Sequence, residues 1–348
     1  MLYVLRKKIE EIDKEIAELM IQRNETAKEI GCIKRTRGMP LVNREVEDAV
    51  IKRYRTAADG TLLPPDVAES ICRLLIRSSV ELQAPMVRKK CDKRVTIVGG
   101  GGKMGKWMTE YFESMGANVN IIDLSAGKPE DMNDSDIVVI SVPISSAGSV
   151  LADADKFCKE DALIFDISSI KSPFASKLKE IATRRKVCSV HPMFGPSAGS
   201  MNERNVIVCS CGCEAAVTEA AELFDNDGSN VMITDIEKHD ELMAYVLGLS
   251  HASGIAFFTA LKESGIPFRE LNGSAGTTFE RFLSASSPVS EEDASLYHEI
   301  QKLNVNSEDM WNVYENAVKK VRDASLSDDD KMFSELMESG RKFLKSQR

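Results

Sequence analysis

Apolar residues follow a helical spacing over the start of the chain, where they recur every three or four positions. They are Leu2, Leu5, Ile9, Ile12, Ile16, Leu19, Ala27 and Ile30. This period predicts one long amphipathic helix over residues 2–35. A second helix is predicted over 44–55. Pro64 and Pro65 open a third that runs to about Gln83, because proline is tolerated in the first helical turn. The first ninety residues therefore form an all-α module of three helices.

The pattern changes at Val95, where short β-branched runs begin to alternate with helical patterns. Strands are predicted over residues 95–100, 118–123, 136–143, 162–168 and 186–192. Such alternation is typical of a parallel sheet with crossover helices. After about residue 236 the chain is helical again, and the polar tail beyond Ala324 contains one more amphipathic helix. The fold class is thus multidomain, α followed by α/β and then α.

Four segments follow from these patterns. Residues 1–87 form the helical module, and residues 88–93, after Pro85, form a basic linker. Residues 94–236 form a Rossmann-like nucleotide-binding domain with a parallel sheet. Residues 237–348 form an all-helical domain for substrate binding and dimerisation.

Charge is distributed unevenly along the chain. The net charge is −9, which argues against nucleic acid as a partner. Residues 1–93 hold 19 Lys and Arg against 15 Asp and Glu, a balance of +4, which leaves −13 for the rest. A basic module joined to an acidic remainder suggests that the first module binds a small anionic ligand.

Cysteine usage and the N-terminus point to the cytoplasm. The eight cysteines lack a paired framework, and the sequence begins without the apolar core of a secretory signal. Cys209, Cys211 and Cys213 stand at alternate positions, whereas metal sites favour C-x-x-C with further ligands nearby. We therefore expect no metal site, and a strand end with the cysteines on one face.

One uncharged stretch, residues 243–261, is just long enough to span a membrane. It contains His251, two serines and a threonine, and it is the only stretch of this kind. A buried core helix or a dimer-interface helix is the better interpretation, so no membrane partner is expected.

A glycine-rich loop lies between the first predicted strand and the next helix. Gly100, Gly102 and Gly105 fit the pattern G-x-G-x-x-G, with Lys103 and Met104 between the last two. One glycine makes a tight turn, one lets the backbone approach a pyrophosphate, and one allows close packing of helix on strand. The free N–H groups at the helix start then bind the phosphates. The loop predicts a dinucleotide cofactor.

The second predicted strand ends at Asp123, 23 residues after Gly100. A carboxylate there accepts hydrogen bonds from a ribose diol and repels a 2′-phosphate, which favours NAD over NADP. Lys128 offers a cation for a 2′-phosphate and keeps NADP open as the alternative.

Further polar groups follow the strands of the predicted sheet. Ser169 and Lys171 come just after one strand, and His191 comes at the end of the next. His251 and Arg281 lie in the helical region. Ligands bind at the carboxyl ends of strands in open parallel sheets. A histidine there suits a base that accepts a hydroxyl proton beside a nicotinamide.

Five motifs between about residues 94 and 320 resemble those of prephenate dehydrogenase. They are VGGGGKMG, DISSIKSP, HPMFGPSAGS, EKHDELMAYVLGLSH and FERFLSASSP, in that order. The resemblance implies oxidation of the ring carbinol of prephenate by NAD with loss of CO₂, which yields 4-hydroxyphenylpyruvate. It implies that His191 takes the hydroxyl proton and that Ser169 orients either this histidine or the hydroxyl. Arg281 would bind a substrate carboxylate, and His251 would line the pocket. Prephenate and its aminated relative arogenate are not distinguished.

Residues 2–84 resemble the all-helical chorismate mutase. The motif match carries over at Arg6, Arg23, Lys34, Arg44, Glu45, Ser79 and Gln83. The resemblance implies that the arginines bind the two carboxylates of chorismate, and that Lys34 and Gln83 stabilise charge on its ether oxygen. The rearrangement is pericyclic, so binding the compact conformer and stabilising charge are sufficient.

Helix geometry adds two expectations for this module. Arg23 and Lys34, eleven residues apart, share one helix face, and so do Ser79 and Gln83. Arg6 lies about 25 Å from Arg23 along the same helix, too far to bind the same small diacid. We therefore expect Arg6 to reach into the site of a second protomer in a homodimer.

The loop PLVNRE departs from the mutase pattern. It is shorter than usual, and Leu41 stands where the family places an acid. The departure concerns the ordering of the loop or the contact to the substrate hydroxyl.

The sequence thus predicts a cytoplasmic, homodimeric chorismate mutase–prephenate dehydrogenase of tyrosine biosynthesis. Two alternatives stay open. In the first, the helical module is a dimerisation or regulatory element without catalysis. In the second, the protein is an NAD-binding sensor without chemistry.

Overall fold

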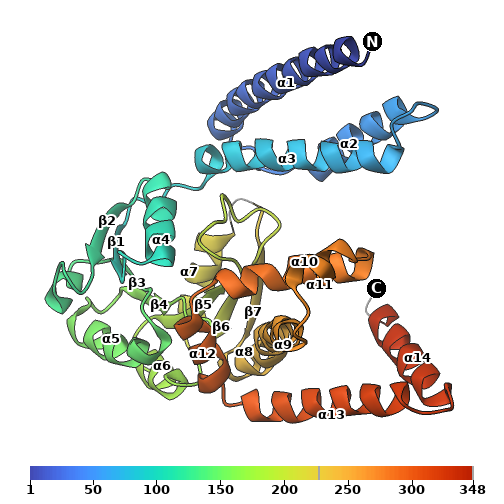
Figure 1. Cartoon of the computed structure of the whole chain (residues 1–348). Helices are drawn as coiled ribbons and strands as arrows, with labels where there is room; N and C mark the ends of the chain where they lie inside the picture. Colours follow the sequence, from blue (N-terminus) through green and yellow to red (C-terminus); the bar gives the residue numbers. More distant parts are fainter. Residues whose placement is uncertain (226–227, 347–348) are drawn as a thin grey trace. The chain divides into compact units, whose positions relative to one another are not determined.

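The computed structural model describes residues 1–225 and 228–346 (Figure 1). It divides into two compact units. Unit 1 comprises Met1–Ser168 and Lys177–Asp235, and unit 2 comprises Ser169–Ser176 and Ile236–Arg348. A short segment after a strand of the sheet thus belongs with the C-terminal helices.

Three helices form the N-terminal module: α1 (Leu2–Arg37), α2 (Arg44–Ala58) and α3 (Pro65–Val87). The helix α1 ends at Gly38, whose left-handed φ of 61° lets its N–H bond back to the last turn. The helix α2 begins after Asn43, whose side chain accepts the N–H of Val46. The three predicted helices are confirmed. Pro85, predicted for the linker region, instead lies inside the last turn of α3.

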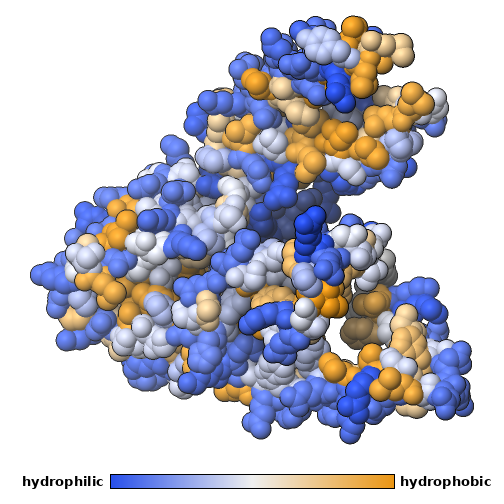
Figure 2. Space-filling model, viewed as in Figure 1, coloured by the Kyte–Doolittle hydropathy of each residue, from blue (hydrophilic) through white to orange (hydrophobic). Residues whose placement is uncertain are grey.

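The packing of α1 is uneven along its length. Its C-terminal part buries Ala27 and Gly31 against α3, where a Cβ on Gly31 would lie 3.0 Å from Cγ of Gln83. In the N-terminal part, by contrast, Leu5 is 54% exposed and Ile9 is 58% exposed. Figure 2 shows hydrophobic side chains gathered over this module. The first half of the apolar stripe therefore has no partner within the described residues.

A seven-stranded sheet follows the module, in the order β2-β1-β3-β4-β5-β6-β7. The strands are β1 (Arg94–Val98), β2 (Asn118–Ile122), β3 (Ile137–Ile140), β4 (Leu163–Asp166), β5 (Val187–Pro192), β6 (Asn205–Ser210) and β7 (Asn230–Asp235). All neighbours are parallel except β5 and β6. The five predicted strands are confirmed.

The strand β6 was expected only as a strand end at Cys209 and β7 was not predicted, and together they change the character of the sheet. A parallel connection requires a crossover, usually a helix, and residues 193–204 form none. The strand β6 therefore returns antiparallel to β5. Cys209 is buried within β6, and Cys213 caps the next helix, so the CSCGC stretch extends beyond the strand end.

Helices cover both faces of the sheet: α4 (Lys103–Ser114), α5 (Ile144–Phe157), α6 (Ala175–Ala182) and α7 (Glu214–Phe224), with a short 3₁₀ turn, η1 (Pro129–Met132). The helices α4 and α7 share one apolar core. Tyr111 stacks on Trp107 at 5.4 Å and on Phe224 at 5.9 Å between ring centroids. This core fixes the position of α4, whose N-terminus faces the glycine loop.

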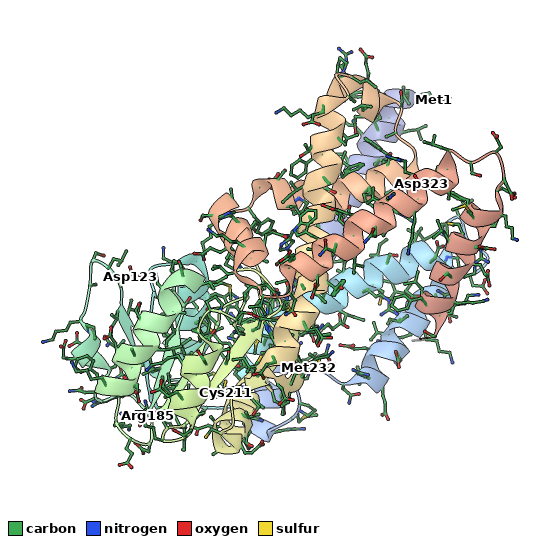
Figure 3. The ribbon with its side chains drawn as sticks, turned by 90° about the horizontal axis from the view of Figure 1, so that it is seen from below. Met1, Asp123, Arg185, Cys211, Met232 and Asp323 are labelled. Atoms are coloured by element: carbon green, nitrogen blue, oxygen red, sulfur yellow. The ribbon has the colours of Figure 1, made fainter. Side chains whose placement is uncertain are left out.

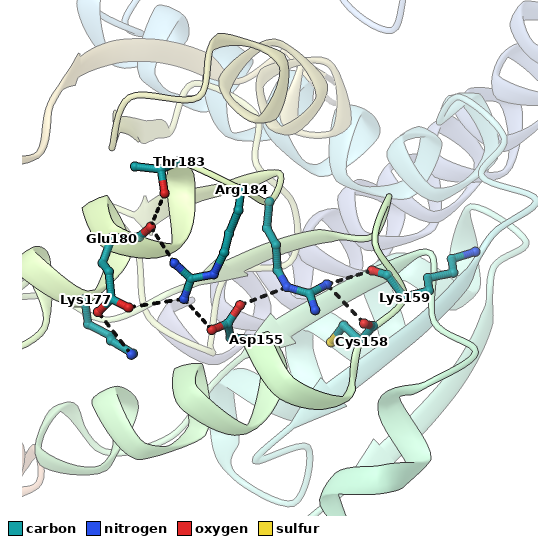
Figure 4. Close-up of polar contacts among 8 residues, drawn as sticks. Asp155, Cys158, Lys159, Lys177, Glu180, Thr183 and Arg184 are labelled. Atoms are coloured by element: carbon teal, nitrogen blue, oxygen red, sulfur yellow. Dashed lines mark hydrogen bonds and ion pairs between the residues drawn. The ribbon is translucent and has the colours of Figure 1, made fainter.

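Ion pairs hold the start of β5 in place (Figure 4). Asp155 on α5 accepts hydrogen bonds from Arg184 at 2.6 Å and from Arg185 at 2.9 Å. Arg185 also donates to the carbonyl of Cys158 at 3.1 Å. Burial alone would raise the pKa of Asp155, but the two arginines outweigh burial and lower it. The strand that carries His191 thus begins at a fixed point.

Unit 2 consists of helices, as predicted. They are α8 (Ile236–Met243), a π-helical turn η2 (Ala244–Leu249), α9 (Ser250–Glu263), α10 (Phe268–Gly273), α11 (Thr277–Glu291), α12 (Ala294–Leu303), α13 (Ser307–Ser325) and α14 (Lys331–Lys345). The predicted tail helix is α14. The π turn leaves the carbonyl of Gly248 to accept the amide N–H of Gln301 at 2.8 Å.

The continuous helix Ile236–Glu263 is long and apolar enough to cross a membrane by composition alone, and 28% of its most apolar window is buried. A single such helix is weak evidence for a membrane span. Its low burial matches a helix that packs against another chain better than one in a core.

Candidate active sites

The glycine loop occupies the turn between β1 and α4. Gly99 adopts a left-handed φ of 85°, and a Cβ there would lie 2.1 Å from the carbonyl oxygen of Ser141. A Cβ on Gly105 would lie 2.2 Å from the carbonyl oxygen of Gly99. Neither position tolerates a side chain. The tight turn therefore falls at Gly99, one residue before the predicted motif, and Gly105 provides the close packing of helix on strand.

The start of α4 has the features of a phosphate site. Its N-cap is Gly102, which supplies no side-chain cap, so the first-turn N–H groups of Lys103 and Met104 keep their hydrogen-bonding capacity. The positive end of the helix dipole lies at the same place. The residues present thus fit a dinucleotide pyrophosphate.

Asp123 lies directly after β2, beside the loop (Figure 3). Its Oδ2 accepts the N–H of Gly101 at 2.8 Å, and its Oδ1 accepts the N–H of Leu124 at 2.7 Å. A carboxylate held here fits a ribose diol and disfavours a 2′-phosphate. The predicted role of Asp123 agrees with this geometry. Lys128, the alternative phosphate ligand, is exposed and bonds through its backbone to Asp131 at 3.0 Å.

His191 is the second-last residue of β5 and is only 4% exposed. Because β1, β3, β4 and β5 are parallel, the carboxyl end of β5 and the glycine loop lie at the same edge of the sheet. The structure therefore places His191 at the edge where the sequence predicted it.

In unit 2, the segment after β4 is fastened to Asp240 of α8. Both carboxylate oxygens of Asp240 lie 3.0 Å from the backbone N of Lys171, and Oδ2 accepts the N–H of Ser172 at 2.6 Å. The hydroxyl of Ser172 donates to the same oxygen. Asn304 donates to the carbonyl of Asp240 at 2.7 Å. Ser169, three residues before Ser172, is thus positioned by the helical unit.

Asp240 is a buried anion. It is 2% exposed, and its Oδ1 lies 2.7 Å from Nδ1 of His239. Burial favours the neutral acid, but the hydrogen bonds from His239 and Ser172 outweigh burial and hold the pKa of Asp240 below its usual value. The sequence motif contained Asp240, yet residue types alone gave it no role, since its partners are backbone groups about 70 residues earlier.

His251 and Arg281, predicted for the substrate pocket, also lie in unit 2. The ring of His251 stacks on Tyr297, with centroids 4.1 Å apart and planes at 6°. Burial lowers the pKa of His251, so the ring is neutral at neutral pH, and its Nδ1 has no hydrogen-bond partner within the described residues. Arg281, on α11, is exposed.

A cavity of about 560 Å³ lies between α1, α2 and α3. The predicted residues Arg23, Lys34, Ser79 and Gln83 all line it. Arg23 donates through Nη1 to the carbonyl of Leu75 at 2.6 Å and to the hydroxyl of Ser79. Lys34 donates to the carbonyl of Leu41, which lies in the short loop. The structure thus brings together the predicted faces of α1 and α3.

Gln83 carries a further sign of a ligand site. It is 6% exposed, and its Oε1 has no hydrogen-bond partner within the described residues. A buried unsatisfied amide oxygen is costly, and a polar ligand in the cavity would relieve that cost.

Two predicted residues, Arg44 and Glu45, are exposed and do not line the cavity. Each residue of α2 turns the helix by about 100°, which carries this pair away from the face of Asn43. That face presents Glu47 instead, together with Val50 and Arg53. The motif match selected the adjacent pair Arg44 and Glu45. Counting one helical turn from the N-cap residue Asn43 would have selected Glu47 instead.

Glu47 and Lys34 interact across the cavity. Burial raises the pKa of Glu47, and the nearby Lys34 opposes that rise. Burial lowers the pKa of Lys34, and Glu47 opposes that fall. The pair therefore forms a partly desolvated acid and base within the site.

Arg6 does not line this cavity. It lies in the exposed first half of α1, 17 residues before Arg23, so it cannot serve the site of its own chain.

Three family models match the chain in succession. They are chorismate mutase type II over residues 5–84, the nucleotide-binding domain of prephenate dehydrogenase over 108–247, and the dimerization domain of prephenate dehydrogenase over 235–339.

Similar proteins match the chain as a whole or in part. The T-protein of Haemophilus influenzae is 26% identical over 301 residues, which cover 85% of this chain and 80% of that protein. A chorismate mutase of Methanocaldococcus jannaschii is 30% identical over 89 residues, 26% of this chain and 90% of that protein. The crystal structure of prephenate dehydrogenase from A. aeolicus, in complex with hydroxyphenyl propionate and NAD⁺, shares the fold. Its TM-score is 0.60 at 19% identity, covering 73% of this chain and 98% of that one. The three-helix module contains a cavity lined by four of the predicted mutase residues, and the sheet carries the glycine loop at its edge. The chain belongs to the family of bifunctional chorismate mutase–prephenate dehydrogenases.

Proposed function

We propose that the three-helix module isomerises chorismate to prephenate, and that the dehydrogenase part oxidises prephenate with NAD, as one enzyme of tyrosine biosynthesis. The observation that carries the proposal is the convergence of two cations and two polar side chains on one cavity of the module. A non-catalytic dimerisation element would need no such convergence.

In the mutase site, binding alone promotes the reaction. Arg23 binds one carboxylate of chorismate and holds the compact conformer. Lys34 and Gln83 donate hydrogen bonds to the ether oxygen, where negative charge develops as its bond to carbon breaks. Glu47, rather than the exposed Glu45, accepts a hydrogen bond from the substrate hydroxyl.

The mutase site is completed by a second protomer. Arg6 of one chain enters the cavity of the other, as the exposed apolar stripe of α1 packs in the dimer. The helical domain of unit 2 forms a second interface of the homodimer, and the apolar helix Ile236–Glu263 packs there rather than in a membrane. Cytoplasmic location agrees with the eight cysteines, none of which forms a disulfide in the described part of the chain.

In the dehydrogenase site, NAD⁺ held by the glycine loop and Asp123 would accept the hydride of the ring carbinol carbon. His191 takes the proton of the same hydroxyl, so the carbinol becomes a carbonyl. The ring carboxylate leaves as CO₂, the electron pair of its broken bond makes the ring aromatic, and the carbonyl oxygen becomes a phenol by taking the proton back from His191. Ser169 orients His191 or the hydroxyl, Arg281 binds the remaining carboxylate and His251 lines the pocket in its neutral form. Formation of the aromatic ring supplies the driving force, so positioning and one base are enough.

The test follows NADH formation with chorismate as the only carbon substrate and NAD⁺ present, beside a reaction supplied with prephenate. NADH from both substrates is the expected result. NADH from prephenate alone would show that the helical module has no mutase activity. If a folded protein forms no NADH from either substrate, the proposal is overturned.

A further inference from the structure

The charges around the mutase cavity identify a residue that the motif comparison did not. The charged side chains that line the cavity are Arg23, Lys34, Arg53 and Glu47. Lys34 and Glu47 face each other and compensate, so the surplus of two positive charges consists of Arg23 and Arg53. Within one protomer, two uncompensated cations suit a substrate with two carboxylates, and Arg6 of the second protomer would add a third cation.

Arg23 alone does not satisfy two carboxylates. Its Nη1 already donates to the carbonyl of Leu75 and to the hydroxyl of Ser79. A guanidinium has five N–H donors in a fixed fork, so the remaining donors of Arg23 serve one carboxylate. The second carboxylate requires another cation.

Arg53 has no ionic partner within the described residues, unlike three other arginines of the module. Arg55 lies 2.6 Å from Glu69, Arg73 lies 2.7 Å from the same carboxylate and Arg77 lies 3.2 Å from Glu81. The side chain of Arg53 makes no hydrogen bond or ion pair within residues 1–225 and 228–346. An exposed, unpaired arginine at a cavity is ready to bind an anion without breaking another interaction.

The position of Arg53 suits this role. It lies on the cavity face of α2, about 9 Å along the helix axis from Glu47, a separation comparable to the length of the substrate. With Arg23 it also lines an adjoining groove of about 550 Å³ beside Tyr54 and Leu63. The two arginines therefore stand at the junction of two hollows.

We propose that Arg53 binds the second carboxylate of the mutase substrate from within the same protomer, in the place that motif matching gave to Arg44. The assignment rests on the mutase activity of the three-helix module. It leaves Arg6 of the second protomer as an additional cation, not as the sole partner of that carboxylate.

The test compares Arg53→Ala with Arg44→Ala, the residue that motif matching favours, and with the control Lys52→Ala, an exposed cation of the same helix that lies outside the cavity. Steady-state kcat and KM for chorismate are measured, and dehydrogenase activity with prephenate in the same chain reports folding. Arg53→Ala is expected to raise KM about 10- to 100-fold, the usual effect of losing a charged hydrogen bond. Arg53→Lys is expected to recover part of the loss, and the control Lys52→Ala to change KM by less than about twofold.

Three results would overturn the assignment. The first is an unchanged KM in Arg53→Ala, and the second is a large loss in Arg44→Ala. The third is dissociation of Arg53→Ala into monomers by size-exclusion chromatography, with KM restored at high protein concentration, which would make Arg53 an interface residue. If wild-type protein does not turn over chorismate, the proposed function fails separately. Calorimetric titration with chorismate then compares the same variants without reaction.

Discussion

Asp240 holds the backbone of Lys171 through both of its carboxylate oxygens, each 3.0 Å from the amide nitrogen. The two residues are 69 positions apart, one in the segment after a strand and the other on a C-terminal helix. The bond joins the segment Ser169–Ser176 to the helices of unit 2, to which the segment belongs. It makes the placement of Ser169 depend on a residue that is not expected to touch the substrate.

Asp240→Asn should therefore impair the dehydrogenase selectively. The amide keeps the size of the carboxylate but directs an NH₂ group at the N–H donors of the segment. We expect kcat with prephenate to fall about 10- to 100-fold, as small misplacements of catalytic groups do. The Kd for NAD and the mutase activity should stay unchanged. Asp235→Asn, at an exposed strand end, is the matched control. Equal losses in mutase and dehydrogenase would instead indicate general unfolding.

A substitution in the glycine loop should also impair the dehydrogenase while it leaves the mutase active. Gly105→Ala places a Cβ 2.2 Å from a backbone oxygen, so either the turn or α4 must shift. We expect the Kd for NAD to rise about tenfold or more while mutase turnover is retained. Gly340→Ala, a helical glycine with nothing within 4 Å, should leave both activities intact. Undiminished NAD binding in Gly105→Ala, measured by fluorescence titration, would contradict this account of the loop.

The pH dependence of the mutase should report the Lys34–Glu47 pair. Lys34 must be protonated to donate to the ether oxygen, and burial lowers its pKa. Mutase kcat/KM should therefore fall as pH rises, with an apparent pKa below that of an exposed lysine. Glu47 raises the pKa of Lys34, so Glu47→Gln should move this fall to lower pH. A profile that stays in place, or moves to higher pH, would rule out the coupling. Dehydrogenase rates over the same range serve as the control.

Arg6 can be tested by mixing inactive chains. Arg6→Ala and Lys34→Ala should each lose most mutase activity. In a mixed dimer, one cavity combines a normal Lys34 with a normal Arg6 from the other chain. Random exchange of protomers should then restore about a quarter of the wild-type activity, because half of the dimers are mixed and each has one intact site. If Arg6 acts within its own chain, mixing restores nothing.

Hydrophobic periodicity predicted the elements of this protein well, because most of them follow their local pattern. The long helix α1, the first five strands and the helices after residue 236 were all predicted. The end of β6 was predicted at the cysteine stretch, but β7 and the antiparallel pairing of β6 were not, since antiparallel return after β5 depends on the missing crossover helix and not on any residue type. Pro85 lies within α3 because one proline in a last turn removes a single hydrogen bond, which neighbouring packing offsets.

Site residues were harder to predict than elements. Arg23, Lys34, Ser79 and Gln83 were found because they lie on regular helices, where spacing fixes a common face. Glu47 and Arg53 were missed because the face of α2 on which they lie depends on where the helix starts. One hydrogen bond, accepted by the side chain of Asn43, marks that start. Asp240 was missed because its ligands are backbone amides, which leave no trace in the sequence.

The fastening of Ser169–Ser176 to Asp240 and Asn304 has a consequence for recombination between relatives. A chimaera that joins the nucleotide-binding part of one protein to the helical part of another, cut near residue 236, would separate the segment from its anchor. In such a hybrid, residues 169–176 would come from one parent, whereas Asp240 and Asn304, which fasten them, would come from the other. Exchange of the helical part is therefore expected to give a functional protein only when residues 169–176 are exchanged together with it.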